Sequence, residues 1–240
     1  MRPILCCLAC AGAWACASDP TGPGPRNHAR VHETGTDDGR LRFGFPVADP
    51  TMITTRIGVD HDPIVQTGVL ASGLCEDYLG RAFPHCYDQH DGSDFILEGD
   101  YATMDAGSIP ILAAHDGVVV DAVDGQYDRC HVQGTDVSCD GYPMIANEVT
   151  LEHDDGSRTL YWHMKKDSVR VAIGDEVKCG DPLGLIGSSG YSSMPHLHFE
   201  FQVADGTVID PYAGPFSQEE SFWEEQNDDP FLPGPGCTAR

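Results

Sequence analysis

The chain has 240 residues, and 40% of them are hydrophobic, which is enough for a core of ordinary size and excludes a chain that is disordered throughout. Fourteen lysine and arginine residues against 38 aspartate and glutamate residues give a formal net charge of −24, which disfavours binding to nucleic acids and to anionic lipid surfaces. The 27 glycines and 17 prolines favour short strands and turns over long helices. We therefore expect an all-β fold.

The N-terminus has the pattern of an export signal. Arg2 is followed by a short apolar stretch that ends near Ala17 and is too short to cross a bilayer. Cys16 follows small residues, so we expect a signal peptide of the lipoprotein type over residues 1–16, with Cys16 as the best lipidation candidate. Cleaved, soluble secretion is the alternative. Both predict a bacterial cell-envelope or secreted location, and a lipid would make the protein a periplasmic or outer-membrane lipoprotein.

Six cysteines lie beyond this segment, and an even number in an exported chain predicts disulfides. Fifteen pairings are possible for six cysteines. The simplest one joins Cys75 to Cys86 and Cys130 to Cys139, and leaves Cys179 to Cys237 to tether a C-terminal extension over residues 216–240. A thiolate metal site is disfavoured because these six cysteines contain no C-x-x-C spacing.

Residues 43–215 are predicted to form one β-rich domain. Residues 17–42 are polar and lack apolar periodicity, which predicts a flexible linker. From residue 43 to residue 215, short apolar runs alternate with turn signals, which predicts antiparallel strands joined by hairpins. The predicted strands are residues 117–123, 148–153, 158–164, 183–187 and 197–203.

Two further segments are less regular. Residues 62–89 show no clear period and predict a long loop held by a disulfide. Ser217 and Glu220 have the spacing of a capping box ahead of Phe222 and Trp223, which predicts a short surface helix.

The most informative stretch is Pro195-His196-Leu197-His198-Phe199-Glu200. Strand side chains alternate between two faces, so Leu197 and Phe199 belong to a core face while His196 and His198 stand on the opposite, polar face. The two imidazoles are then about 6 to 7 Å apart, which suits one metal ligand and one neighbour. Surface histidines on a half-exposed strand are the alternative for this stretch taken alone.

Two other motifs add candidate ligands. His90 and Asp94 have an H-x-x-x-D spacing, and Gly92 and Ser93 between them disfavour a helix, so the two side chains would converge through a turn. Asp91 has no role in this interpretation. In Tyr161-Trp162-His163 we expect Tyr161 and His163 to share one face of a strand.

The joint occurrence of H-x-x-x-D, Y-x-H and P-H-L-H-F-E, in this order, resembles the lysostaphin-type (LytM-like) zinc metallopeptidases, which are peptidoglycan endopeptidases. The similarity extends from about Phe43 to Tyr212. It includes the Gly174-Asp175-Glu176-Val177 run, several spaced glycines, and Asp210-Pro211 after the last strand. The resemblance implies antiparallel sheets in a single domain of the LytM type, similar to a barrel-sandwich hybrid, with long loops and little helix.

The resemblance also implies roles for five residues. His90, Asp94 and His198 would bind Zn²⁺, and His196 and His163 would be the catalytic histidines. Two imidazoles and one carboxylate leave the fourth position of a tetrahedral zinc open for water, whose pKa the metal lowers to about 7. We assign His196 as the general base, and His163 would orient the water or stabilise the oxyanion.

The predicted function is zinc-dependent hydrolysis of peptide stems or cross-bridges in bacterial peptidoglycan. We expect a monomer whose partner is the peptidoglycan peptide and whose contact with the membrane is limited to an N-terminal lipid. A non-catalytic envelope regulator, which binds the wall or activates an amidase, and an exported protease of non-wall proteins are the alternatives. The long segment before His90, and Met194 where a glycine often precedes Pro-His, leave the substrate range open.

Overall fold

The structure is a computed structural model that describes residues 40–64, 74–227, 232–234 and 236–237. The predicted signal peptide, Cys16 and nearly all of the predicted linker lie outside the described residues. Among the residues described, no helix combines the length and the apolar character that a membrane crossing requires.

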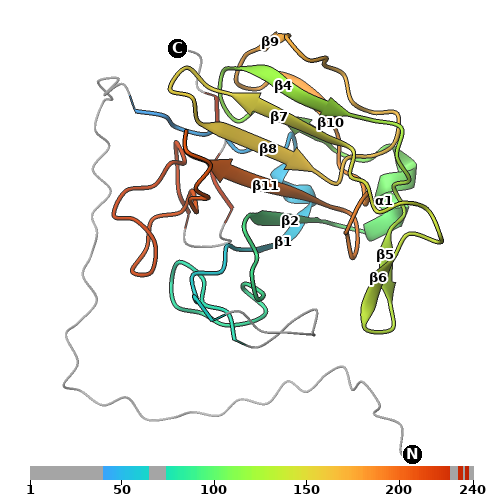
Figure 1. Ribbon diagram of the computed structural model, residues 1–240, viewed down its shortest axis with the longest axis horizontal. Coiled ribbons are helices and arrows are strands. Elements are labelled where there is room, and N and C mark those ends of the chain that lie inside the picture. The colour runs from blue at the N-terminus through green and yellow to red at the C-terminus, as the bar shows by residue number, and fades with distance from the viewer. Residues whose placement is uncertain (1–39, 65–73, 228–231, 235, 238–240) are drawn as a thin grey trace, which may run out of the picture. The chain divides into compact units, whose positions relative to one another are not determined.

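One antiparallel sheet dominates the described part of the chain, in the strand order β1-β2-β11-β8-β7-β4-β9 (Figure 1). Its strands are β1 (Ile53–Ile57), β2 (Ser93–Leu97), β4 (Gly117–Val123), β7 (Glu148–Glu152), β8 (Arg158–Trp162), β9 (Glu176–Val177) and β11 (His196–Gln202). The helical elements described are α1 (Asp100–Ala106) and the 3-10 turn η1 (Pro50–Met52). These findings confirm the all-β prediction.

Two small antiparallel pairs accompany the large sheet. Strand β3 (Pro110–Leu112) pairs with β10 (Pro182–Leu185), and β5 (His131–Gln133) pairs with β6 (Asp136–Ser138). All five predicted strands exist, and β4 has the predicted bounds; the others differ by one or two residues at an end. Strands β1, β2, β3, β5, β6 and β9 were not predicted, because they are short and their apolar residues do not alternate over a long enough run.

The core lies against one face of β11, as the alternation predicted. Leu197 and Phe199 are fully buried and Phe201 is nearly so. The ring of Phe43 packs against those of Phe199 and Phe201, with centroids 5.7 and 4.8 Å apart. This face anchors β11 firmly, so the residues on its other face are held in fixed positions.

The short helix predicted at Ser217 is wrong. The Ser217 hydroxyl donates to the carbonyl of Tyr212 instead of capping a helix. The backbone that follows is extended along residue 43: the Phe43 amide donates to the Phe222 carbonyl at 2.6 Å, and the Glu224 amide donates to the Phe43 carbonyl at 2.8 Å. These hydrogen bonds to Phe43 and the burial of Trp223 together outweigh the local preference for a helix.

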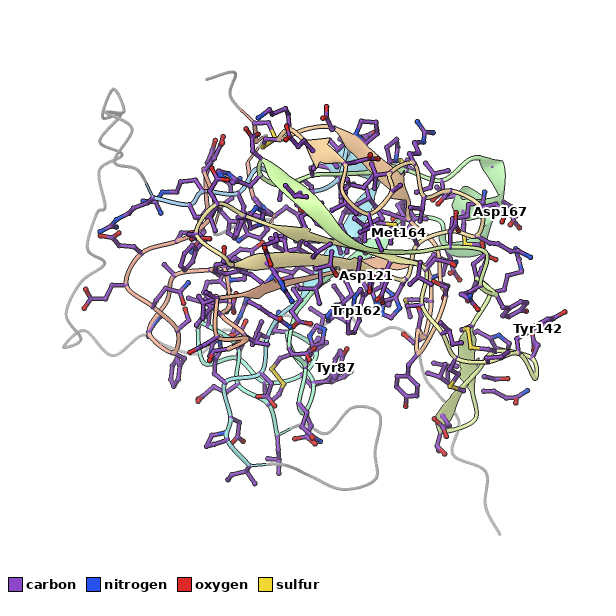
Figure 2. All side chains as sticks on the ribbon, turned by 45° about the horizontal axis from the view of Figure 1, so that its top comes forward. Tyr87, Asp121, Tyr142, Trp162, Met164 and Asp167 are labelled. Carbon is purple, nitrogen blue, oxygen red and sulfur yellow. A yellow bond between two sulfur atoms is a disulfide. The ribbon has the colours of Figure 1, made fainter. Side chains whose placement is uncertain are left out.

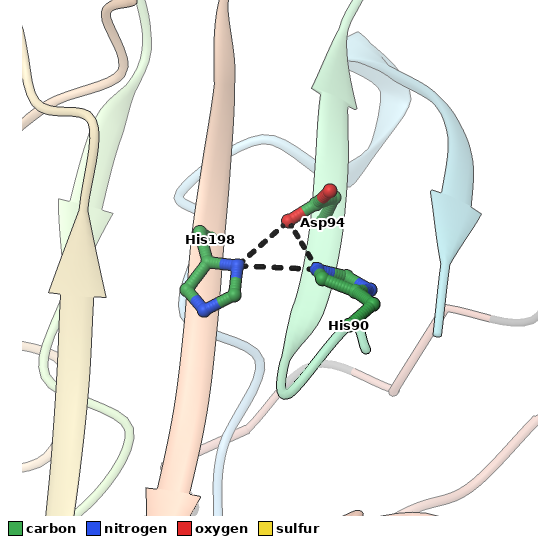
Figure 3. Close-up of side chains that lie close together, drawn as sticks. All are labelled: His90, Asp94 and His198. Carbon is green, nitrogen blue, oxygen red and sulfur yellow. Dashed lines mark hydrogen bonds and ion pairs between the residues drawn. The ribbon is translucent and has the colours of Figure 1, made fainter. Parts of the chain in front are cut away.

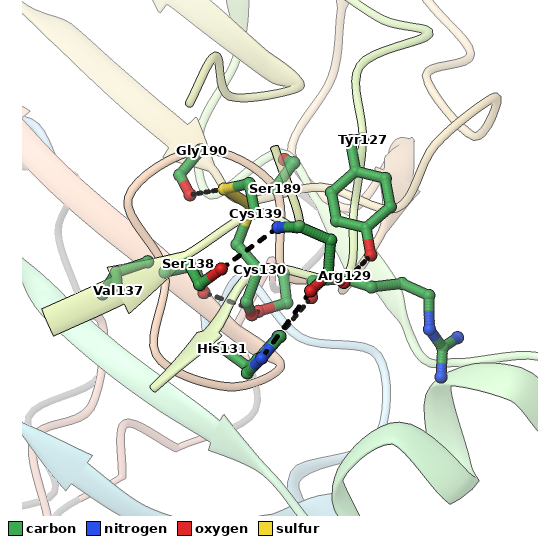
Figure 4. The surroundings of a disulfide bond; sticks show 12 residues. Tyr127, Arg129, Cys130, His131, Val137, Ser138, Cys139, Ser189 and Gly190 are labelled. Carbon is green, nitrogen blue, oxygen red and sulfur yellow. Dashed lines mark hydrogen bonds and ion pairs between the residues drawn. A yellow bond between two sulfur atoms is a disulfide. The ribbon is translucent and has the colours of Figure 1, made fainter. Parts of the chain in front are cut away.

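The three disulfides are Cys75–Cys86, Cys130–Cys139 and Cys179–Cys237, which confirms the simplest pairing. The second one closes the β5–β6 hairpin (Figure 4). This hairpin is tied to the segment before β11, because the Cys130 amide donates to the carbonyl of Ser188 at 2.9 Å. The disulfide therefore braces the segment that leads into the histidines of β11.

Candidate metal centre

Strands β2 and β11 bring two of the candidate ligands together. In the antiparallel register His198 of β11 lies opposite Asp94 of β2, so their side chains project from the same face at neighbouring positions. His90 lies in the turn before β2, where its amide donates to the carbonyl of Tyr87 at 3.1 Å. As the sequence predicted, a turn and not a helix brings His90 back to Asp94.

The three side chains converge on one point (Figure 3). His90 Nε2 lies 3.0 Å from Asp94 Oδ1 and 3.2 Å from His198 Nδ1, and His198 Nδ1 lies 2.9 Å from Asp94 Oδ1. Each residue is at most 4% exposed. Three donor atoms in a buried cluster, two of them imidazole nitrogens, form a group that could hold a metal ion.

The spacing of these atoms fits zinc. Bonds of about 2.0 to 2.1 Å at a tetrahedral angle place two ligand atoms about 3.3 Å apart, and the observed separations of 2.9 to 3.2 Å are close to this value. A set of two imidazoles and one carboxylate is also the donor type that zinc accepts in catalytic sites. The residues present therefore fit the ion that the sequence predicted.

His90 and His196 are oriented by backbone carbonyls. His90 Nδ1 lies 2.7 Å from the carbonyl oxygen of Gly58, and His196 Nδ1 lies 2.7 Å from that of Met194. A carbonyl only accepts, so each Nδ1 carries the proton and each Nε2 offers its lone pair to the site. The Nε2 atom of His196 lies 3.5 Å from Asp94 Oδ1, directly beside the cluster.

A left-handed backbone conformation at His163 brings its side chain to the site. His163 follows the last residue of β8 and has φ of +65°, a left-handed conformation that a non-glycine residue seldom adopts. This backbone turn breaks the alternation, so Tyr161 is buried in the core while His163 lies over His196, with ring centroids 4.6 Å apart. The prediction that Tyr161 and His163 share a face is wrong for this reason.

The pKa values of Asp94 and His198 are shifted in opposite directions. Burial raises the pKa of Asp94, but the imidazoles of His90 and His196 outweigh it and hold this pKa well below its usual range. Burial lowers the pKa of His198, but the carboxylates of Asp94 and Glu200 outweigh it and raise the pKa to about 10.

The pKa of His163 is lowered, in contrast to that of His198. Burial, together with the imidazoles of His196 and His198, lowers the pKa of His163 well below 6.5. His163 is therefore neutral at pH 7. Its Nδ1 donates to the carbonyl of Ser189 at 2.7 Å, so its Nε2 carries a lone pair and acts as an acceptor.

The structure adds aromatic residues that the sequence analysis did not select. Tyr87 stacks on His90, with ring centroids 4.1 Å apart, and its hydroxyl donates to Asp94 Oδ2 at 3.4 Å. Tyr87 and Trp162 are both labelled in Figure 2. Trp162 lies opposite His198 in the β8–β11 register and stacks on its ring. Once β8 was known to pair with β11, the strand register would have placed Trp162 opposite His198. Tyr87 lies in a loop whose sequence shows no periodicity, so no such rule could have identified it.

Comparison with known proteins identifies the family. The model of peptidase family M23 matches residues 89–211, which is half of the chain and includes all five candidate residues. The chain belongs to peptidase family M23. The resemblance seen in the sequence is thereby confirmed, as is the fold class that it implied.

Several characterised M23-like proteins are similar over this region. The glycyl-glycine endopeptidase ALE-1 of Staphylococcus capitis is 36% identical over 126 residues, covering 51% of this chain and 28% of that protein. Lysostaphin of Staphylococcus simulans is 44% identical over 69 residues, covering 27% of this chain and 14% of that one. The murein hydrolase activator EnvC of Escherichia coli is 32% identical over 98 residues, covering 40% and 22%. The chain therefore spans less than a third of the length of each relative.

The chain is also similar to a solved structure. The catalytic domain of lysostaphin from Staphylococcus simulans is 30% identical, covers 52% of this chain and 77% of that domain, and has a TM-score of 0.36.

Gly92 gives a first prediction for this M23 site. A Cβ atom at residue 92 would lie 2.5 Å from Cε1 and 2.6 Å from Nε2 of His198, so Gly92→Ala must displace the His198 ring or the turn. Overpacking of this kind costs about 1 to 3 kcal/mol. We expect a lower melting temperature and weaker zinc binding, measured by thermal unfolding and by competition with a chromogenic chelator.

The matched control is Gly206→Ala, in the turn after β11. Gly206 has φ of +86° and open space around its Cα, so alanine there is strained without touching the site. It should lower stability while zinc affinity stays unchanged. Equal zinc affinity in Gly92→Ala and the wild type would show that Gly92 does not set the position of His198.

Proposed function

We propose that the protein is a zinc-dependent endopeptidase that hydrolyses peptide stems or cross-bridges of bacterial peptidoglycan. The observation that carries this proposal is the convergence of His90, Asp94 and His198, with two further imidazoles beside them, in a chain of family M23. The similarity to a glycyl-glycine endopeptidase supports a peptide bond as the target.

His90, Asp94 and His198 would hold the zinc through Nε2, Oδ1 and Nδ1. When bound there, zinc supplies a Lewis acid for the scissile carbonyl and lowers the pKa of a water molecule. Burial of all three ligands keeps the site in a low-dielectric environment, where the charge of Asp94 acts strongly on its neighbours.

His196 would act as the general base. Its Nε2 lone pair faces the cluster because Nδ1 is committed to the Met194 carbonyl. After His196 takes a proton, the Asp94 carboxylate at 3.5 Å stabilises the imidazolium, which can then protonate the departing amine.

His163 would orient the attacking water. It is neutral, and its Nε2 accepts and does not donate, which suits holding a water hydrogen and argues against oxyanion stabilisation by this residue. Oxyanion stabilisation would then need a different donor, and the sequence alone could not separate these two roles.

The three disulfides support export, because such bonds persist in oxidising compartments. We therefore extend the proposal to the bacterial envelope or the medium, with a lipid on Cys16 as the proposed anchor. Labelling cells with a clickable fatty acid would detect this lipid, and Cys16→Ala would abolish the label.

The test of the activity is digestion of purified peptidoglycan followed by mass spectrometry of the soluble fragments. The zinc-loaded protein should create new peptide ends, whose masses identify the cleaved bond, while the chelated protein and Asp94→Ala should create none. Intact wall with all three samples contradicts the proposal. Stimulation of a wall amidase would then favour the regulator, which the similarity to EnvC supports, and cleavage of casein but not of wall would favour a protease of other proteins.

A further inference from the structure

His198 is the one site imidazole whose ring is not oriented by a hydrogen bond to a backbone carbonyl among the described residues. The other three donate from Nδ1 to a backbone carbonyl at 2.7 Å, in the pairs His90 with Gly58, His163 with Ser189 and His196 with Met194. His198 instead turns Nδ1 toward Asp94, and its buried Nε2 has no hydrogen-bond partner among the described residues. A buried ring N–H without a partner is costly, so a nearby acceptor is expected.

Two carboxylates flank this nitrogen. Asp91 Oδ1 lies 3.6 Å from His198 Nε2, and Glu200 Oε2 lies 3.7 Å from it. The side chain of Asp91 is 55% exposed, whereas that of Glu200 is 3% exposed. Solvent screens Asp91, so the buried Glu200 is the stronger partner.

Glu200 is also held in place. It lies two residues after His198 on β11 and therefore on the same face of the strand. The side-chain amide of Gln202 donates to Glu200 Oε1 at 2.5 Å, which leaves Oε2 directed at His198. Alternate positions of one strand thus form a line from Gln202 through Glu200 to His198.

We propose that Glu200 is a positioning residue, whose carboxylate accepts the Nε2–H of His198 and so fixes the ring with Nδ1 directed at the metal site. This inference rests on the proposed zinc site. At 3.7 Å the two atoms lie beyond hydrogen-bond distance, so the proposal includes a small approach of the carboxylate to the ring. The charges of Asp94 and Glu200 together also balance the two positive charges of a zinc ion.

The test measures zinc affinity directly by chelator competition, together with the absorption spectrum of the cobalt-substituted protein. Partners of this kind contribute about 10- to 100-fold in metal affinity, so Glu200→Ala should weaken zinc binding by about that factor and alter the cobalt spectrum. Glu200→Gln keeps an acceptor oxygen and the side-chain volume, and should retain most of the affinity. Asp91→Ala should have a smaller effect than Glu200→Ala because Asp91 is 55% exposed.

The matched control is Glu152→Gln on β7, where the glutamate forms an exposed ion pair with Arg158. It should bind zinc as the wild type does. Thermal unfolding in the presence of a chelator shows whether each metal-free variant is folded, and the isosteric Glu200→Gln keeps the test usable if Glu200→Ala does not fold.

Several outcomes would overturn the inference. Wild-type zinc affinity and an unchanged cobalt spectrum in Glu200→Ala would remove Glu200 from this role, as would an equal loss in Asp91→Ala. Asp91, His198 and Glu200 also have donor atoms within 4.8 Å of one another, so two zinc ions per wild-type chain and one in Glu200→Ala would make Glu200 a ligand instead. Failure of the wild type to bind any zinc would instead refute the proposed function.

Discussion

His196→Ala should lower kcat for peptidoglycan cleavage by about 10²- to 10⁴-fold, the usual contribution of a general base. His196 Nε2 faces the cluster and lies 3.5 Å from Asp94 Oδ1, but it is not one of the three atoms that converge on the ion site. Zinc affinity should therefore stay within a few-fold of the wild type. Steady-state kinetics on a soluble wall fragment and chelator competition measure the two quantities separately.

His131→Ala is the control for His196→Ala, because His131 is an imidazole on β5 outside the cluster. It should leave kcat unchanged. His163→Ala should also lower kcat, and the double variant should lose less than the product of the two effects, because the proposed mechanism has both residues act on the same water molecule. A His196→Ala enzyme that keeps more than a tenth of the wild-type kcat would assign the base to another residue.

The sequence could predict the convergence of the candidate ligands because their placement depends on short-range rules. Strand alternation put His196 and His198 on one face and the phenylalanines in the core, and a glycine-containing turn was enough to return His90 to Asp94. These rules hold whatever the rest of the fold does. Pairing between distant strands was needed to bring the two motifs together, and only the family resemblance supplied it.

The errors came from interactions between distant residues. The left-handed φ of His163, just after β8, leaves no trace in the pattern of apolar residues. Pairing of residues 222–224 with Phe43 replaced a helix that the capping box favoured locally. Asp91 and Glu200 looked like ordinary polar positions until the strand register placed both carboxylates beside His198.

The second large effect, on the stability of the fold, is expected at the buried ion pair between Arg56 of β1 and Asp210. Arg56 Nη2 lies 3.3 Å from Asp210 Oδ1, with both side chains at most 1% exposed. The Arg56 guanidinium also lies 3.7 Å from the centre of the Tyr212 ring, and its Nε donates to the Ser93 hydroxyl at 3.1 Å. Asp210 thereby connects the segment after β11 to β1, and through Ser93 to β2, which carries the candidate ligand Asp94.

Asp210→Asn should destabilise the fold by about 3 to 5 kcal/mol, because it leaves the Arg56 charge buried without its partner. For a domain of this size, about 2 to 4 °C per kcal/mol converts this to a fall of roughly 6 to 20 °C in melting temperature. Arg158→Met is the control, since the Arg158–Glu152 pair is exposed and should contribute at most about 1 kcal/mol. Thermal unfolding monitored by circular dichroism measures both variants.

The double variant Arg56→Met with Asp210→Asn separates the cost of an unpaired charge from the loss of packing. Without either charge, the double variant should be more stable than Asp210→Asn alone, because replacing a buried pair by uncharged groups is often nearly neutral. Equal stability of the two would show that the unpaired Arg56 charge is not the source of the loss, and would point instead to Asp210 Oδ2, which lies 3.1 Å from His61 Nε2. In that case Asp210 would act through its contact with His61, and Arg56 would be held by the Ser93 hydroxyl and by the rings of Tyr212 and Tyr78.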